Sequence, residues 1–283
     1  RAYRKARRTL IDTLNNPEKR PDVVHLHTAA DWSWWRKRRF AYLAHDAGSK
    51  VVVHIHSGQF DTWLGESTSK RSSSLRAFLK KVNAKTIVLS PGWKQILEPM
   101  IGPTCVVNNP ISDSLQEGSG KRDRLHLLLL GRDDPVKGHA FAIQVCETVK
   151  ETIPNLKVTM SGISSTPHDW ISTPGWVSAQ QKIALLQSAS LLLVPSAFEG
   201  QPLVVLEAMS CGLPVLVSDR LLSMPEGVEI ASFEDKNQWV QKVLQMLEQP
   251  PSPSGLIAQS EPYRIQAVAQ RWSEMYADSS RIE

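Results

Sequence analysis

The stretch "SLLLVPSAFEGQPLVVLEAMSCGLPVLVSD" (residues 190–219) alternates short aliphatic runs with one longer apolar segment. The runs "LLLVPS" and "LPVLVSD" have the length and aliphatic content of buried strands. The segment "PLVVLEAMS" between them predicts a helix, because Pro202 suits a first helical position and Gly212 permits the turn that ends it. This strand–helix–strand order indicates a parallel sheet covered by helices on both faces.

The same alternation extends over most of the chain. Further strands are expected at 22–27, 50–56, 85–90, 105–110, 125–131 and 156–162. Helical patterns such as "HAFAIQVCETVKETI" and "QQKIALLQSA" lie between the strands. The predicted fold class is therefore α/β.

The length of 283 residues predicts two domains, since one domain usually takes about 100–200 residues. The polar stretch "NNPISDSLQEGSGKRDR" (108–124) separates two series of strands. We interpret it as an interdomain linker, with a long surface loop as the alternative. A proline-rich stretch at 248–255 precedes a last amphipathic segment, "YRIQAVAQRWSEMY" (263–276).

Composition and charge limit the kinds of binding partner and compartment to consider. Much of the net charge of +5 lies in "RAYRKARR" at the start and in "RKRR" at 36–39. Such basic clusters can bind nucleic acid, anionic lipid or an acidic substrate, and the alternative is a solvated helix face with no binding role. No segment approaches the ~20 apolar residues of a membrane span, and no apolar run follows the basic start as in a signal peptide. Cys105, Cys146 and Cys211 lie among apolar residues, which predicts buried reduced thiols and a reducing compartment. The chain begins without Met and in the middle of a pattern, so we expect a fragment.

Two glutamates flank the start of the helix predicted after residue 201. The helix N-terminus follows the carboxyl end of a parallel strand, where α/β proteins bind ligands, and amides near Gly200, Gln201 and Leu203 suit a phosphate. Glu199 and Glu207 suit hydroxyl groups nearby. The alternative is a surface charge at Glu199 and a partnered core-edge carboxylate at Glu207.

A second loop has the same position relative to its strand. In "LLLLGRDDPVKGH" (127–139), Gly131 ends a buried strand and two cations, Arg132 and Lys137, follow it. A planar guanidinium and a mobile ammonium suit a diphosphate, although the spacing is that of neither a P-loop nor a dinucleotide fingerprint. A solvated basic loop is the alternative.

Together these segments resemble a known family. "GRDDPVKG", "PGWVSAQQKIALLQSASLLLVPSAFEGQPLVVLEAMSCGLPVLVSD" and the Glu-x7-Glu frame are similar to the C-terminal domain of GT-B glycosyltransferases of family GT4. The segments at 25–60, 88–97 and 106–112 resemble the branch that builds surface polysaccharides. The resemblance implies two Rossmann-like domains facing a cleft. It gives an incomplete acceptor-side domain at 1–112, a nucleotide-sugar domain at 113–260, and a helix at 261–283 that returns toward the first domain.

The resemblance also implies roles for individual residues. Arg132 and Lys137 would neutralise the leaving diphosphate in place of a divalent metal, Glu207 would hold ribose hydroxyls, and Glu199 and His56 would face the transferred sugar. The remaining donor-site residues are Gly131, Gly162, Trp176, Val177, Gly200, Gln201, Pro202 and Leu203. The amides at Gly200–Leu203 would hold phosphate, and backbone around Trp176–Val177 would meet the base.

Alternating histidines occur on two predicted strands, His25 with His27 and His54 with His56. Because residues two apart share a face of a strand, each pair points to one side. We rank packed or hydrogen-bonded core histidines first, His56 at the sugar second and a metal site third. His139 and His168 are expected at the surface.

The stretch "DWSWWRKRRF" (31–40) mixes three tryptophans with four cations. The resemblance places it beside the acceptor, where aromatic rings would meet sugar faces or a membrane surface. Stacking on nucleic acid and a tryptophan packed beneath a basic helix are the alternatives.

We therefore expect a retaining hexosyltransferase that uses a nucleotide-diphosphate sugar without metal or other cofactor. Its expected acceptor is a saccharide or lipid-linked saccharide in surface polysaccharide synthesis, in the cytoplasm or at the inner face of a membrane, with peripheral membrane association and no nucleic acid partner. The alternatives are a non-catalytic nucleotide-sugar-binding module and a nucleic-acid-binding protein, which would show steeply salt-dependent binding.

Overall fold

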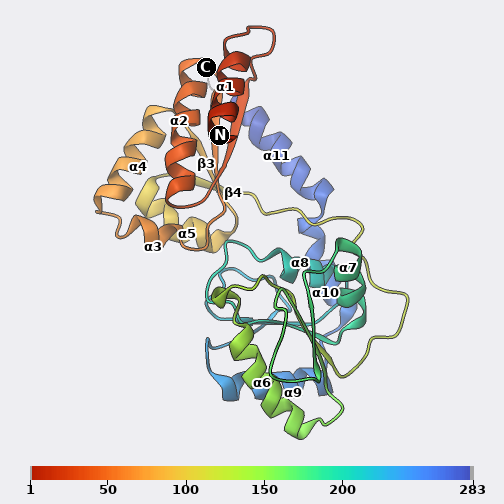
Figure 1. Ribbon diagram of the computed structural model, residues 1–283. Coiled ribbons are helices and arrows are strands. Elements are labelled where there is room, and N and C mark those ends of the chain that lie inside the picture. Colours follow the sequence, from red (N-terminus) through yellow and green to blue (C-terminus); the bar gives the residue numbers. More distant parts are fainter. Residues whose placement is uncertain (1, 281–283) are drawn as a thin grey trace. The chain divides into compact units, whose positions relative to one another are not determined.

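The computed structural model describes residues 2–280, with side chains described as far as residue 277 (Figure 1). The chain forms two compact units. The first runs to Asn109 and takes up the chain again from Val268, and the second is Pro110–Ala267. The boundaries predicted from the sequence lie after residues 112 and 260.

The first unit is built on a four-stranded parallel sheet of order β1-β2-β3-β4. Its strands are β1 (Val23–Thr28), β2 (Lys50–Ile55), β3 (Lys85–Val88) and β4 (Thr104–Val106). Its helices are α1 (Ala2–Leu14), α2 (Trp32–Asp46), α3 (Phe60–Leu64), α4 (Lys70–Lys81), α5 (Pro91–Ile101) and most of α11 (Ile265–Ser280).

Helices cover the first sheet because its inner strands are mostly buried, with five of the six residues of β2 and three of the four residues of β3 buried. Val52 and Ile87 pack with Val268 of α11 in one cluster. In α2, Trp34 is buried while Trp32 and Trp35 are exposed, so one of the three tryptophans does pack beneath the basic helix.

The second unit contains a six-stranded parallel sheet of order β10-β9-β8-β5-β6-β7. Its strands are β5 (His126–Leu129), β6 (Lys157–Ser161), β7 (Ile171–Gly175), β8 (Leu191–Val194), β9 (Val215–Ser218) and β10 (Glu229–Ala231). Its helices are α6 (His139–Thr152), α7 (Ala179–Ser188), α8 (Leu203–Ser210), α9 (Lys236–Glu248) and α10 (Pro253–Ser260), with short 3-10 turns η1 (Pro135–Lys137) and η2 (Glu261–Tyr263).

Successive residues of the central strands pack into hydrophobic cores on opposite faces of the sheet. Leu127 and Leu129 of β5 pack with α6 and α9, whereas Leu128 between them packs with α7, α8 and α10. Figure 1 shows α6 and α9 on one side of this sheet and α7, α8 and α10 on the other. This two-sided burial explains the nearly continuous apolar runs in the sequence and confirms the α/β class.

Three local expectations need correction. Helix α8 begins at Leu203, so Pro202 is its N-cap rather than its first helical residue. His139 is buried, and its Nε2 lies 2.9 Å from the carbonyl oxygen of Ser161, because the first turn of α6 packs under the loop after β5. Cys105 is only half-buried, because β4 is an edge strand, while Cys146 and Cys211 are buried as expected.

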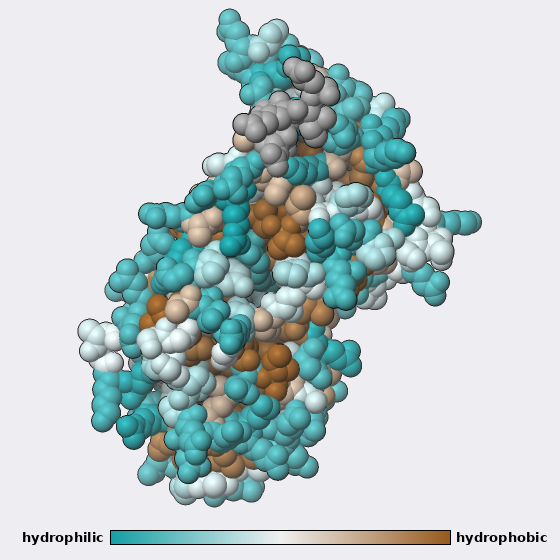
Figure 2. Space-filling model, turned by 180° about the vertical axis from the view of Figure 1, so that it is seen from behind, coloured by the Kyte–Doolittle hydropathy of each residue, from teal (hydrophilic) through white to brown (hydrophobic). Residues whose placement is uncertain are grey.

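Hydrophilic side chains cover most of the face shown in Figure 2, with hydrophobic residues in separate patches. Among the described residues, none of the helices combines the length and apolar character needed to cross a bilayer.

Candidate functional site

A pocket of about 490 Å³ opens at the carboxyl ends of β5 and β8 in the second unit. Its lining includes ten of the predicted donor-site residues: Gly131, Arg132, Lys137, Trp176, Val177, Glu199, Gln201, Pro202, Leu203 and Glu207. The remaining lining residues are Leu130, Ser161, Ser178, Ala179, Lys182 and Val204. Two loops and the start of α8 thus contribute to one concave site, the position at which α/β sheets commonly bind ligands.

The two glutamates of the pocket are each paired with a lysine. The Lys137 ammonium donates a hydrogen bond to the Glu199 carboxylate, which also accepts one from the Ser196 hydroxyl at 3.2 Å. Lys182 of α7 donates to Glu207 of α8 at 2.5 Å. Both carboxylates are largely buried, with side-chain exposures of 19% for Glu199 and 13% for Glu207, so each needs such a partner.

Arg132 is the solvent-facing cation of the pocket. Its side chain is 70% exposed, and its guanidinium lies 3.5 Å from the Asp134 carboxylate. A surface ion pair of this length contributes little to stability. The guanidinium therefore remains available to an anionic ligand that enters the pocket.

Close backbone packing holds the loop after β5 in place. A Cβ at Gly162, whose φ is +89°, would overlap the carbonyl oxygen of Gly131. A Cβ at Gly138 would lie 2.7 Å from the carbonyl oxygen of Pro195, and the Ala197 amide donates to the Val136 carbonyl at 2.9 Å. Gly162 thus permits a close approach of the chain to itself. Neither Gly162 nor Gly200 is among the lining residues.

Trp176 and Val177 lie on the segment between β7 and α7. Trp176 is 79% exposed at the pocket, an unusual position for a large aromatic side chain. The following helix is held by a capping box, in which Ser178 and Gln181 exchange hydrogen bonds between side chain and backbone. This arrangement offers an aromatic surface at one edge of the pocket.

His56 belongs to the first unit, where it lies in a group of four histidines on β1, β2 and the residue after β2. Its Nε2 is 2.8 Å from Nδ1 of His27. Burial, followed by repulsion from neighbouring imidazoles, lowers the pKa of His56 and of His25 to about 4 and that of His54 to about 2. These rings are therefore neutral at neutral pH. The first-ranked expectation, packed or hydrogen-bonded core histidines, describes the buried His54 and the half-buried, hydrogen-bonded His25 and His56, whereas His27 is exposed.

Lys182 is the functional candidate that sequence reasoning missed. It is the fourth residue of α7, where a lysine is ordinarily a solvated helix residue, and no local spacing connects it with Glu207. The available signal was the requirement that a carboxylate inside the apolar helix "PLVVLEAMS" have a cationic or hydrogen-bonding partner.

Comparisons with known proteins agree with this geometry. Residues 124–249 match the family described as "Glycosyl transferases group 1". The glycogen synthase of Mycobacterium tuberculosis is 26% identical over 223 residues, which are 71% of this chain and 52% of the relative. The UDP-Gal:alpha-D-GlcNAc-diphosphoundecaprenol alpha-1,3-galactosyltransferase of Escherichia coli is 25% identical over 230 residues, or 70% of this chain and 58% of that protein. The chain thus spans little more than half the length of these relatives.

Solved structures show the same fold at low sequence identity. Anabaena Alr3699/HepE in complex with UDP and glucose superimposes with a TM-score of 0.76 at 13% identity, covering 98% of this chain and 81% of that one. Sucrose-phosphate synthase from Thermosynechococcus elongatus gives a TM-score of 0.72 at 17% identity, with coverage of 98% and 78%. The chain thus has the GT-B fold of these solved glycosyltransferases, and the segment that is similar to the group 1 family lies within its second unit.

Proposed function

We propose that this chain transfers a hexose, with retention of anomeric configuration, from a nucleotide-diphosphate sugar to a saccharide or lipid-linked saccharide. The observation that carries the proposal is the pocket of the second unit. It places Arg132, Lys137, two carboxylates and the N-terminus of α8 around one cavity. Its approximate volume of 490 Å³ falls in the ordinary range for small-molecule sites.

Positive charge in the pocket matches the leaving group of such a reaction. As the glycosidic bond of the donor breaks, negative charge gathers on the diphosphate and positive charge on the sugar. Arg132, Lys137 and the first amides of α8 would stabilise that diphosphate, the type of electrostatic contribution that is commonly the largest in catalysis. We propose that these fixed cations take the place of a divalent metal on the diphosphate.

The ion pairs of the pocket suggest how the donor is accommodated. A diphosphate competes with Glu199 for the Lys137 ammonium, and the freed carboxylate then accepts hydrogen bonds from sugar hydroxyls. Glu207 remains oriented by Lys182 and accepts hydrogen bonds from the ribose. One lysine thus exchanges partners on donor binding while the other keeps its partner.

The acceptor hydroxyl is proposed to attack the same face of the sugar that the diphosphate leaves, and the departing phosphate removes its proton. No side chain is assigned as a nucleophile. We propose that His56 of the first unit faces the transferred sugar, as the family resemblance implies. Trp176 is proposed to support the base through its exposed ring.

The class of acceptor is proposed from the relatives and from α2. One relative is named for a diphosphoundecaprenol substrate. In the first unit, Trp32, Trp35 and Arg36 help to line a surface hollow of about 1070 Å³. Exposed tryptophan beside arginine suits a carbohydrate or the surface of an anionic membrane, and we propose that the enzyme acts in surface polysaccharide synthesis at the cytoplasmic face of a membrane.

Nucleotide binding tests the pocket directly. Isothermal titration with UDP, GDP, ADP and their hexose conjugates, in buffer containing EDTA, should identify one preferred nucleotide. Lys137→Ala should weaken its binding by about tenfold or more, since a charge-assisted hydrogen bond to phosphate is lost. Lys157→Ala is the matched control, because that lysine is exposed in the same unit and is paired with Asp123.

Transfer is a separate measurement from binding. The preferred donor should release its hexose to an oligosaccharide or a lipid-linked acceptor, and Glu199→Gln should lower kcat by about 100-fold while the fold is kept. Binding without either hydrolysis or transfer, using a chain that includes any preceding segment of the gene, would leave the non-catalytic module as the better description. Equal binding by Lys137→Ala and Lys157→Ala would refute the proposed diphosphate site.

A further inference from the structure

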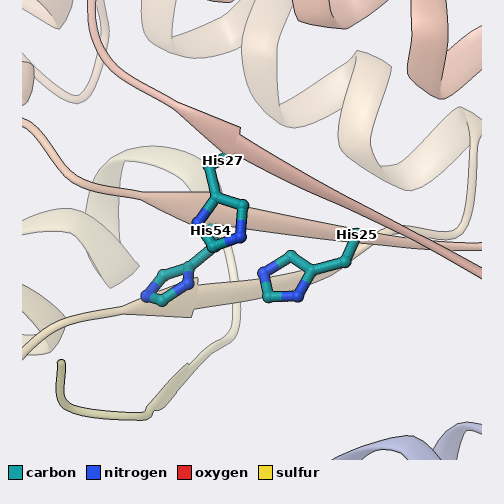
Figure 3. Close-up of side chains that lie close together, drawn as sticks. All are labelled: His25, His27 and His54. Atoms are coloured by element: carbon teal, nitrogen blue, oxygen red, sulfur yellow. The ribbon is translucent and has the colours of Figure 1, made fainter. Parts of the chain in front are cut away.

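Four imidazoles gather on one face of the first sheet. His25 and His27 are two residues apart on β1, and His54 of β2 lies opposite His27 in the register. The rings of His25 and His27 are stacked with centroids 4.3 Å apart, and those of His54 and His56 are 4.0 Å apart. Figure 3 shows the rings of His25, His27 and His54 close together beside adjacent strands.

Buried ring nitrogens in this group have no hydrogen-bond partner. His54 is 3% exposed, and neither its Nδ1 nor its Nε2 makes a hydrogen bond. The Nε2 atom of His25 is also buried without a partner. Buried polar atoms are normally satisfied, so three such atoms in one cluster point to a ligand that takes up their lone pairs.

The partnered nitrogens have the arrangement found around metal-bound histidines. His25 Nδ1 lies 2.7 Å from the hydroxyl of Tyr276, and His27 Nδ1 lies 2.8 Å from His56 Nε2. When Nδ1–H of His25 donates to Tyr276, its Nε2 carries a lone pair. A hydrogen bond that fixes the tautomer and orientation of a ligating imidazole is the usual second contact of such a residue.

We propose that His25, His27 and His54 bind one late first-row divalent cation of the Zn²⁺ type. One ring nitrogen from each residue lies within 4.8 Å of the others, with no carboxylate or thiol in this group of described residues. Nitrogens on a shared tetrahedral ion are separated by about 3.3 Å, so side-chain rotations that move the nitrogens by about 1 Å close the set. A site made of imidazoles alone selects Zn²⁺, Co²⁺, Ni²⁺ or Cu²⁺ over Mg²⁺ and Ca²⁺.

The ion would join three elements of the first unit. It binds β1 and β2 directly, and Tyr276 connects it with α11, whose Trp272 ring also lies 4.5 Å from that of His25. All of these residues belong to the first unit, whereas the proposed donor pocket consists of residues of the second. Metal binding can therefore be measured separately from nucleotide binding, although His56, which we propose to face the sugar, is hydrogen-bonded to the ligand His27. The ion would stabilise the first unit.

Metal titration of the chain without a polyhistidine tag tests this site. After removal of metal with a chelator, calorimetry at neutral pH should show one Zn²⁺ per chain with a Kd below about 10 μM, and no binding of Mg²⁺. Excess Zn²⁺ should raise the thermal midpoint of the first unit by about 5 °C. Co²⁺ should give visible absorption bands that excess Zn²⁺ removes.

Four variants separate ligation from general effects. His54→Phe and His25→Phe should each weaken Zn²⁺ binding by about 100-fold, and Tyr276→Phe by about tenfold. His168→Gln is the control, since that histidine pairs with Glu147 in the second unit, and it should bind as the original chain does. The metal-free melting curve of His54→Phe should match or exceed that of the original chain, because no hydrogen bond is lost.

Absence of Zn²⁺, Co²⁺ and Ni²⁺ binding with a Kd below about 10 μM would overturn the proposal. Unchanged Zn²⁺ affinity in His54→Phe would overturn it as well. If that variant fails to fold, His25→Phe decides by the same criterion.

Discussion

Glu207 is the carboxylate of α8, a helix whose other residues are apolar or small. Its environment explains why two interpretations remained open from the sequence. The carboxylate is partnered by Lys182, as expected of a core-edge acid, and it also lines the pocket, as expected of a ligand-binding group. Glu207 can therefore form an ion pair with Lys182 and line the pocket at the same time, because the lysine approaches from α7 and leaves part of the carboxylate facing the cavity.

Replacement of Lys182 should affect both stability and binding. Lys182→Met leaves a largely buried carboxylate without its cation, so the free energy of unfolding should fall by about 1–2 kcal/mol, and affinity for the preferred nucleotide should fall about tenfold. Lys182→Arg should restore most of both. Urea denaturation and calorimetry measure the two effects. Unchanged values in Lys182→Met would show that Glu207 does not depend on this pair.

At the scale of elements, Arg122 connects the segment after residue 109 with two helix ends. Its guanidinium donates to the carbonyl oxygens of Leu186 and Ala189 at the end of α7, at 2.7 and 2.9 Å, and to that of Cys211 at the end of α8. Carbonyls at a helix C-terminus have no partner within the helix and carry partial negative charge, which favours a cation there. The stretch that we interpreted as a linker therefore contains a packing residue of the second unit.

Removal of this contact should destabilise the second unit. Arg122→Met keeps much of the apolar stem but loses three hydrogen bonds, so we expect a loss of about 2–4 kcal/mol in the free energy of unfolding. Arg124→Met, two residues away at an exposed position, should change stability by less than about 0.5 kcal/mol. Chemical denaturation of the two variants measures the difference, and equal midpoints would contradict the role of Arg122.

Eight of the ten strands were predictable from aliphatic runs, because strands buried on both faces have a composition that turns and exposed segments lack. The two that were missed lie at the edges of the second sheet. In β7, "ISTPG" contains polar residues, a proline and a glycine, and β10 has three residues, so neither provides an apolar run. Edge strands receive less burial, and their sequences are correspondingly less distinctive.

At the scale of the molecule, the two units differ in how the chain builds them. The second is one continuous segment, Pro110–Ala267, with its own sheet, two clusters of buried apolar residues and the complete pocket. The first requires residues from both parts of the chain, since α11 supplies Val268 and Trp272 to its core. Of the two units, only the second therefore consists of one contiguous segment of the chain.

Excision of the second unit should preserve the pocket. A fragment of residues 110–267 should unfold cooperatively and bind the preferred nucleotide with a Kd within about threefold of that of the full chain, because an independent core supports the site. A chain that ends at residue 264 should keep this affinity, while its first unit loses α11 and melts at lower temperature. Calorimetric scans and nucleotide titrations of both proteins provide the comparison. Loss of nucleotide binding in the folded fragment would show that the first unit contributes to the donor site.

The sequence by itself determined the α/β class, the positions of eight strands along the chain, and the two loops whose residues line the pocket. It could do so because periodic burial and strand-to-helix turns are local properties, and because parallel strands bring their carboxyl ends to one edge. Tertiary structure decided the lysine that partners Glu207, the helix ends held by Arg122, and the contact between His25 and Tyr276, which are separated by 251 residues in the chain. These partners come from distant segments, and the sequence around a polar side chain does not indicate which group it will contact after folding.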